Sequence, residues 1–254
     1  MLITPYDLLV PLGEPATLEV EVEDRWMAFI DPPVQGVELE VAGVGRATSA
    51  RNGLAAFDLG VLPEGTHRLE VRYLHKSIDA LVRVIPRETP VIIVDIDETI
   101  ANVTPAGFIL RAVRNVRPLP GSREILKELA KTMQIVYLTA RDHIFTRKTK
   151  LWLRLAGMPE GPVYLRKGTR YWKTPAREHK FQRLGELRKQ FPNIPWGVGD
   201  KPGDAAAYTA RGIRPILIAP GRPAEVSADV PCFPTWKNIL DYIRMSERPR
   251  NPES

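Results

Sequence analysis

The sequence predicts an α/β protein built on a parallel sheet, preceded by a smaller all-β region. Up to about residue 86, short segments alternate apolar and polar residues with a period of two, which is typical of strands that bury one face. Beyond residue 90, continuous apolar runs alternate with amphipathic segments, as parallel strands alternate with covering helices. We therefore expect a β region at 1–86, a linker at 87–90, an α/β region at 91–246 and a disordered tail at 247–254.

The β region is divided into short strands by turn signals rich in glycine and proline. We expect the strands at 8–10, 16–23, 37–41, 45–48, 54–58, 68–73 and 78–85. About seven short strands with alternating pattern are typical of an antiparallel sandwich. Segments 13–18 and 62–67 resemble those of bacterial immunoglobulin-like modules, which implies an immunoglobulin-like sandwich here.

The α/β region contains five apolar runs that read as buried strands and five segments that read as helices. We expect the strands at 91–94, 135–138, 163–165, 195–198 and 215–218. We expect the helices near 122–131, 146–156, 178–191, 204–211 and 235–245. This alternation predicts a Rossmann-like parallel sheet with helices on both faces.

The whole-chain composition hides two regions of opposite charge. The chain has 36 Lys+Arg and 30 Asp+Glu, for a net charge of +6. Residues 1–89 hold 8 Lys+Arg and 14 Asp+Glu, a net −6, and the remaining 28 and 16 give +12. The single cysteine, Cys232, excludes an internal disulfide, and no apolar run approaches the roughly 18–20 residues that cross a bilayer. We expect a cytoplasmic protein, peripheral at a membrane, with an anionic partner that meets the second region.

Chemically active side chains follow three of the predicted parallel strands. They are Asp95 and Asp97 after the first, Thr139 and Arg141 after the second, and Asp200 and Asp204 after the fourth. Carboxyl ends of parallel strands meet at one edge of a sheet, so these side chains should converge. Four carboxylates in one place repel one another, and a hard divalent cation such as Mg²⁺ relieves that repulsion. The pattern therefore predicts a Mg²⁺ site.

Such a site suits phosphoryl transfer. A carboxylate beside Mg²⁺ can attack phosphorus and form an aspartyl-phosphate, which divides hydrolysis into two easier steps. A second acid two residues further on can protonate the leaving oxygen and then deprotonate the hydrolytic water. A lysine and a hydroxyl group can bind the phosphoryl oxygens as charge moves onto them.

These motifs, in this order and each behind a strand, resemble the haloacid-dehalogenase (HAD) superfamily of phosphohydrolases. The resemblance covers about 90–220 and rests on segment 95–99 (Asp-Ile-Asp-Glu-Thr), on Thr139, on a lysine before a helix, and on segment 199–204 (Gly-Asp-x-x-x-Asp). It implies a phosphatase with a HAD fold. An acid at position 97 implies phosphate-ester chemistry rather than dehalogenation.

The resemblance also implies a role for each residue. Asp95 would be the nucleophile and a Mg²⁺ ligand. Asp97 would be the general acid and base, with its backbone carbonyl on the metal. Thr139 would bind the phosphoryl group, and Asp200 would complete the metal site. Asp204 would either ligate the metal directly or orient the shell around Asp200.

The lysine of the third motif is assigned by position. Lys180 precedes an amphipathic helix and lies 20 residues before Asp200, where the family's third motif belongs. Lys173 and Lys167 are the alternatives, in a basic loop that faces either substrate or solvent.

A finer resemblance concerns the substrate. Segments 137–141 and 159–165, with Thr146-Arg147 between them, resemble lipin-type and actin-patch-type phosphatidate phosphatase domains. Lipin-type domains usually have Asn where this chain has Asp200, and their amphipathic amino-terminal region is absent here. The intervals between the motifs leave no room for a cap domain, so the resemblance implies an open site for a large substrate such as phosphatidate.

Basic residues flank the predicted site, and Arg141 and Lys167 are the expected substrate-binding residues among them. The remaining ones are Arg111, Arg114, Arg117, Arg147, Lys148, Arg166, Arg170 and Lys173. Such a rim suits an anionic membrane surface. It equally suits a nucleic-acid backbone, so a polynucleotide-end phosphatase is one alternative. A non-catalytic phosphatidate-binding module, as on phosphatidylinositol-transfer proteins, is the other, although the intact Asp95 and Asp97 weigh against it.

Overall fold

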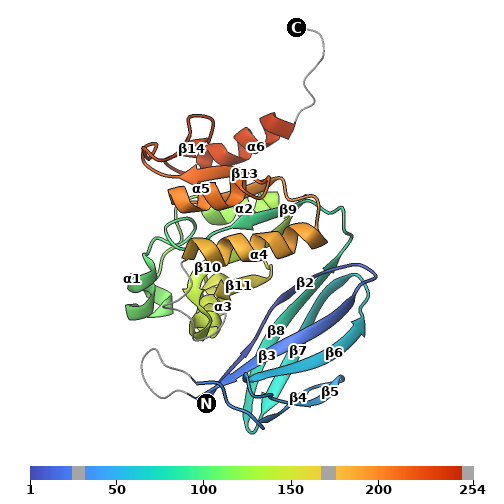
Figure 1. Ribbon diagram of the computed structural model, residues 1–254. Helices are drawn as coiled ribbons and strands as arrows, with labels where there is room; N and C mark the ends of the chain where they lie inside the picture. The colour runs from blue at the N-terminus through green and yellow to red at the C-terminus, as the bar shows by residue number, and fades with distance from the viewer. Residues whose placement is uncertain (25–31, 167–175, 248–254) are drawn as a thin grey trace.

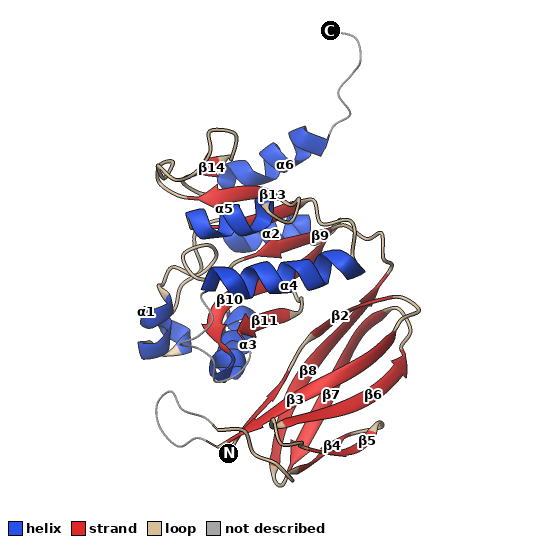
Figure 2. Cartoon of the chain, in the orientation of Figure 1, coloured by secondary structure: helices blue, strands red, loops and turns tan. Residues whose placement is uncertain are grey.

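The computed structural model describes residues 1–24, 32–166 and 176–247. The chain starts with eight strands in two sheets and continues into a six-stranded parallel sheet with helices on both faces (Figures 1 and 2). The prediction of an α/β protein with a parallel sheet is confirmed. The predicted tail lies almost wholly outside the described residues.

The amino-terminal sheets pack around a larger and a smaller apolar cluster. Their strands are β1 (Leu2–Pro5), β2 (Leu8–Pro11), β3 (Pro15–Glu23), β4 (Glu38–Val41), β5 (Gly45–Thr48), β6 (Leu54–Val61), β7 (Gly65–Tyr73) and β8 (Lys76–Ile85). One sheet has the order β1-β3-β6 and the other β2-β8-β7-β4-β5. Alternate residues of both sheets meet in the core, as the period of two predicts.

The structure corrects two details of this region. The short edge strand β1 was not expected, because four residues ending in a proline carry little pattern. The sheets are also not wholly antiparallel, since β2 pairs in parallel with β8. The chain crosses from one sheet to the other between β1 and β2, at Tyr6 and Asp7. The immunoglobulin-like assignment and the domain boundaries stay predictions.

The parallel sheet has the order β11-β10-β9-β12-β13-β14. Its strands are β9 (Val91–Val94), β10 (Gln134–Asp142), β11 (Val163–Arg166), β12 (Trp196–Gly199), β13 (Arg214–Ile218) and the two-residue β14 (Cys232–Phe233). Every pairing is parallel. The central β9 is fully buried on both faces, which explains its continuous apolar run.

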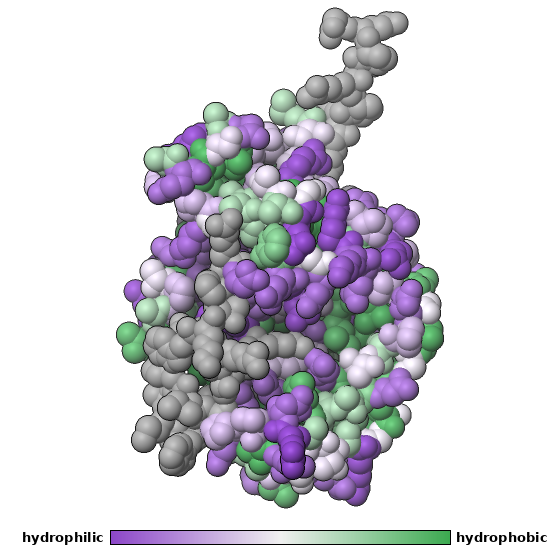
Figure 3. Space-filling model, viewed as in Figure 1, coloured by the Kyte–Doolittle hydropathy of each residue, from purple (hydrophilic) through white to green (hydrophobic). Residues whose placement is uncertain are grey.

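Helices cover both faces of this sheet. They are α1 (Pro105–Leu110), α2 (Ser122–Leu129), α3 (Thr146–Leu155), α4 (Ala176–Gln190), α5 (Pro202–Thr209) and α6 (Ile239–Glu247), with 3₁₀ turns at Val113–Asn115, His143–Phe145 and Trp236–Asn238. Val91 and Ile93 of β9 share a core with α4 and α5, whereas Ile92 and Val94 share one with α2, α3 and α6. The outer surface over α4 is mostly hydrophilic (Figure 3).

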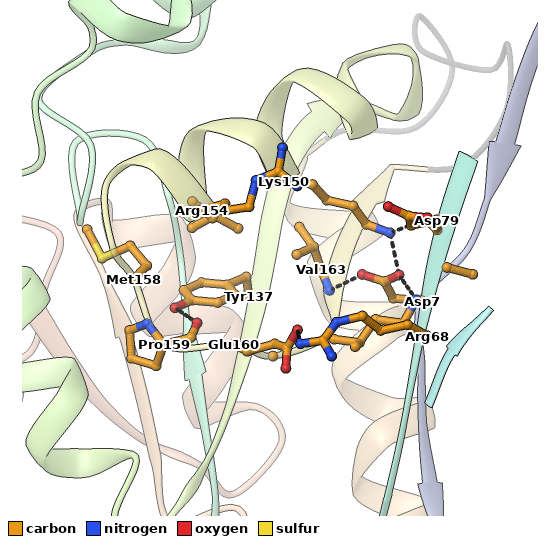
Figure 4. A pocket seen from close by; sticks show the side chains of 14 residues that line it. Asp7, Arg68, Asp79, Tyr137, Lys150, Arg154, Met158, Pro159, Glu160 and Val163 are labelled. Carbon is orange, nitrogen blue, oxygen red and sulfur yellow. Dashed lines mark hydrogen bonds and ion pairs between the residues drawn. The ribbon is translucent and has the colours of Figure 1, made fainter. Parts of the chain in front are cut away.

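The amino-terminal sheets pack directly on the parallel-sheet region. Leu9 and Ile85 belong to the same core cluster as α4 and β9. The backbone N–H of Leu9 donates to the Tyr164 hydroxyl at 2.9 Å. A cavity of about 410 Å³ lies at this junction, and Asp7 and Lys150 meet on its wall (Figure 4). Buried side chains of both regions therefore contact each other directly at the junction.

Candidate active site

Most of the predicted site residues lie at the carboxyl ends of three adjacent strands, β10, β9 and β12, whereas Lys180 and Asp204 lie on helices α4 and α5. Asp95 and Asp97 follow β9, and Asp200 follows β12. Thr139 lies inside β10, which is longer than expected and continues to Asp142 with a register shift after Leu138. Because the three strands are neighbours, motifs far apart in the sequence meet at one edge of the sheet.

Three carboxylates and one ammonium group form the centre of the site. Oxygen atoms of Asp95, Asp200 and Asp204 lie within 4.8 Å of one another. Lys180 lies inside α4 and not before the helix as expected. Its Nζ is 2.8 Å from Asp95 Oδ1 and 2.6 Å from Asp204 Oδ1. The structure therefore brings Lys180 into this cluster, whereas Lys167 and Lys173 lie outside the described residues.

Burial and like charges shift the titration of the cluster. Burial raises the pKa of Asp95 to about 7, with the charges of Asp204 and Asp200 adding and Lys180 opposing. Burial also raises the pKa of Asp200 to about 6. Burial alone would lower the pKa of Lys180, but Asp95 and Asp204 outweigh it and raise that pKa above its usual value. The lysine is thus held as a cation between two acids.

Asp204 fixes both the loop after β12 and the lysine. Its Oδ2 accepts hydrogen bonds from the backbone N–H of Asp200 at 3.3 Å and of Lys201 at 3.2 Å. Its Oδ1 accepts from Lys180. Gly199 makes this approach feasible, because a Cβ there would lie 2.5 Å from the Cβ of Asp204. Because its carboxylate accepts from two backbone N–H groups of the loop and from Lys180, Asp204 holds the loop and the lysine in place.

Asp97 lies outside the carboxylate cluster and pairs with Arg141, a contact that the sequence did not predict. Both of its oxygens accept from the guanidinium of Arg141, at 2.9 Å from Nε and 2.8 Å from Nη2. The hydroxyl of Thr139 lies 3.4 Å from Asp97 Oδ2. Arg141 is 4% exposed and also donates to Thr149 at 3.1 Å. In this structure the guanidinium pairs with Asp97, so its contact with a substrate stays a prediction.

Further groups near the carboxylates were also not singled out from the sequence. Thr99 places its hydroxyl 3.4 Å from Asp200 Oδ1. Lys201 forms ion pairs with Glu98 at 3.3 Å and with Asp200 at 3.5 Å. Glu98 has a positive φ of 56°, which a non-glycine residue rarely adopts and which turns the chain sharply behind Asp97. Glu98 and Thr99 belong to the segment 95–99, and Lys201 belongs to the segment 199–204, so all three lie within motifs identified in the sequence.

The carboxylate cluster fits a Mg²⁺ ion by its donor set. Mg²⁺ prefers oxygen ligands at about 2.0–2.1 Å, so two ligands on opposite sides of the ion are about 4 Å apart. The oxygens of Asp95, Asp200 and Asp204 are already within 4.8 Å, and only small shifts would close them on an ion. A second group of ligand-type side chains, Glu21, Glu23 and His143, lies at the junction with the amino-terminal sheets.

Comparisons with solved structures give only distant similarity. Two structures of Pnkp1/Rnl/Hen1 complexes, one of them titled an RNA repair complex, match at 13% and 12% identity with TM-scores of 0.46 and 0.44. They cover 54% and 60% of this chain, which spans 44% and 55% of theirs, about half of their length. Domains 4 and 5 of the S-layer protein SbsC match 34% of this chain and 51% of that chain, at 15% identity and a TM-score of 0.23. Scores this low support no argument about activity.

A comparison with curated proteins found no match. A model of one protein family, described as PITM 1-3, LNS2 domain, matches residues 92–218, which is half of the chain. The match includes the whole candidate site, from Asp95 to Asp204. The chain therefore belongs to the LNS2 domain family, a lipin-like family of the haloacid-dehalogenase type.

Proposed function

We propose that this protein is a Mg²⁺-dependent phosphomonoester hydrolase that works through an aspartyl-phosphate at Asp95. The observation that carries the proposal is the buried group of Asp95, Asp200 and Asp204 around the ammonium of Lys180. A carboxylate that attacks an anionic phosphoryl group needs positive charge beside it, because two anions otherwise repel. Here Lys180 touches the attacking group itself.

Asp97 handles the proton in both steps of the proposed hydrolysis. An oxygen of Asp95 attacks phosphorus, the ester P–O bond breaks, and the leaving oxygen takes a proton from Asp97. Water then attacks the aspartyl-phosphate and gives a proton back to Asp97, while the bond to Asp95 breaks and inorganic phosphate leaves. Since Arg141 holds both oxygens of Asp97 here, one of these hydrogen bonds has to open before Asp97 donates.

Thr139 and Lys180 supply the contacts to the phosphoryl oxygens in this proposal. Lys180 contacts Asp95, and the Thr139 hydroxyl lies beside Asp97. When bound by Asp95, Asp200 and Asp204, with the backbone carbonyl of Asp97, Mg²⁺ would neutralise the carboxylates and polarise a phosphoryl oxygen.

The proposed substrate is a lipid phosphate such as phosphatidate. Membership of a lipin-like family supports a lipid, and the described segments between β9 and α4 contain no separate cap domain, which suits a large substrate. None of the described helices is long and apolar enough to cross a bilayer. We propose a cytoplasmic protein that meets its substrate at a membrane surface.

The decisive experiment measures phosphate release from phosphatidate vesicles and from 3′- or 5′-phosphorylated oligonucleotides, each with and without Mg²⁺. We expect Mg²⁺-dependent release from the vesicles, lowered about a thousandfold or more in Asp95→Asn. The exposed Asp79→Asn serves as the matched carboxylate control and should keep full activity. Incorporation of labelled phosphate should likewise occur in the control and not in Asp95→Asn.

Each other outcome has a defined meaning. Release from oligonucleotides alone would replace the lipid substrate by a polynucleotide end. Vesicle binding without any release would establish a non-catalytic phosphatidate-binding module and overturn the proposed enzyme. Full activity in correctly folded Asp95→Asn would remove Asp95 as the nucleophile.

A further inference from the structure

The short helix α1 exposes aliphatic side chains beside the candidate site. Leu110, its last residue, is 86% exposed, and the preceding Ile109 is 41% exposed. Figure 1 shows α1 at the margin of the parallel-sheet region, at the left of the view. Single exposed apolar residues are ordinary on protein surfaces. Two consecutive ones at the end of a protruding helix form a small apolar tip.

Three exposed arginines follow this tip in the sequence. They are Arg111, Arg114 and Arg117. Within residues 1–24, 32–166 and 176–247, no carboxylate forms an ion pair with any of them. Their charges are therefore available to an anionic partner, and their aliphatic stems extend the apolar surface. We define the α1 surface as Ile109, Leu110 and these three arginines.

Packing and hydrogen bonds connect the α1 surface to the candidate site. Phe108, directly before the tip, is buried with its ring centroid 3.4 Å from the guanidinium carbon of Arg141. That guanidinium is the one that holds Asp97. The ammonium of Lys148, on α3, donates to the backbone carbonyls of Phe108 and Ile109 at 2.5 and 3.0 Å. Anything that binds the tip is thereby held near Asp97.

We propose that the α1 surface docks on a bilayer that contains anionic lipids, with Ile109 and Leu110 inserted and the arginines at the headgroups. The proposal rests on the proposed function in that it names the surface by which the enzyme meets a lipid substrate. Apolar side chains flanked by cations are what such an interface takes up. A polynucleotide fits less well, since bases stack on aromatic side chains and the exposed tip is aliphatic.

The test is sedimentation of the intact chain with vesicles of phosphatidylcholine, with or without phosphatidylserine. Phosphatidylserine is not a phosphomonoester, so binding is measured apart from hydrolysis. We expect binding only to the anionic vesicles, weakened by salt. The double variant Ile109→Ser, Leu110→Ser should bind about tenfold or more weakly. Each Arg→Ala change should weaken binding about five-fold.

Controls separate this inference from folding defects and from the enzymatic proposal. Val61→Ser removes another exposed aliphatic residue, 61% exposed on β6, and should bind like the wild type. All variants should keep the melting temperature of the wild type. Asp95→Asn should bind the phosphatidylserine vesicles unchanged, so a failure of the phosphatase proposal would leave this result intact. Equal binding by the double variant and by Val61→Ser, or no binding by the wild type, would overturn the docking surface.

Discussion

Asp7 offers a quantitative test of how strongly the amino-terminal sheets stabilise the parallel-sheet region. Its carboxylate is 2% exposed and accepts hydrogen bonds from the backbone N–H of Leu81 at 2.8 Å and of Val163 at 3.1 Å. It also pairs with the Lys150 ammonium at 2.5 Å. Leu81 belongs to the amino-terminal sheets. Val163 and Lys150 belong to the parallel-sheet region, and Figure 4 shows both beside Asp7.

Replacement of Asp7 by alanine leaves two buried N–H groups without their acceptor. Each such group costs about 1–3 kcal/mol, whereas the partly exposed Lys150 can turn to water at little cost. We therefore expect Asp7→Ala to lower the free energy of unfolding by about 3 kcal/mol. Asp7→Asn keeps an acceptor oxygen for only one of the two N–H groups and turns its amide NH2 toward the other, so it should cost about 2 kcal/mol.

The assay is urea unfolding followed by tryptophan fluorescence. Among the described residues, three tryptophans are buried, Trp152, Trp196 and Trp236. All three lie in the parallel-sheet region, so their fluorescence reports on the region that does not contain Asp7. The control is Asp79→Asn, an exposed carboxylate on the wall of the same cavity, which should change stability by less than about 0.5 kcal/mol. A value for Asp7→Ala as small as that of the control would refute the reasoning.

Three further predictions concern other buried groups. Lys180→Met should remove the cation between two acids and lower phosphate release about a hundredfold or more. An unchanged far-ultraviolet circular dichroism spectrum would exclude unfolding as the cause. Gly199→Ala should push its Cβ into Asp204 and destabilise the protein by about 1–3 kcal/mol in urea unfolding; an unchanged midpoint would contradict the close approach. Burial opposes the charged form of His143, but Asp142 and Glu23 outweigh it and raise the pKa from 6.5 to about 10. Because the folded pKa is the higher one, His143 stabilises fully below pH 6.5 and loses this contribution as the pH rises toward 10, a slope that His143→Gln should abolish in melting curves.

The sequence predicted those parts of the fold whose pattern is local and long enough. The apolar run at 91–94 is β9 residue for residue, because a strand buried on both faces requires it. α1 was missed, since six residues with a glycine at position 107 and an exposed tip show no helical periodicity. β14 was missed because two residues carry no pattern at all.

The sequence predicted which residues meet in the candidate site, but it did not predict which side chains pair with each other. Motifs behind adjacent strands converge by topology, so the meeting of Asp95 with Asp200 followed from the strand pattern alone. Which partner Asp97 takes depends on side-chain geometry, and the bidentate pair with Arg141 has no signal beyond the spacing to Thr139. The hydrogen bonds of Asp7 reach residues 74, 143 and 156 positions away, and nothing local announces them.

The opposite net charges of the two regions are reflected in the buried ion pairs between them. At the junction, the buried acids Asp7 and Glu23 of the amino-terminal sheets face Lys150 and His143 of the parallel-sheet region. The more exposed pair of Arg68 and Glu160 has the charges reversed. A buried charge that loses its partner costs several kcal/mol, so separating the two regions at these pairs would be unfavourable unless water replaced the partners. The arginines after α1 take no part in these ion pairs within the described chain, and a positive surface near the candidate site is left facing outward. Ion pairs thus join the two regions at one side, and the proposed docking on an anionic membrane would use the unpaired arginines at the other.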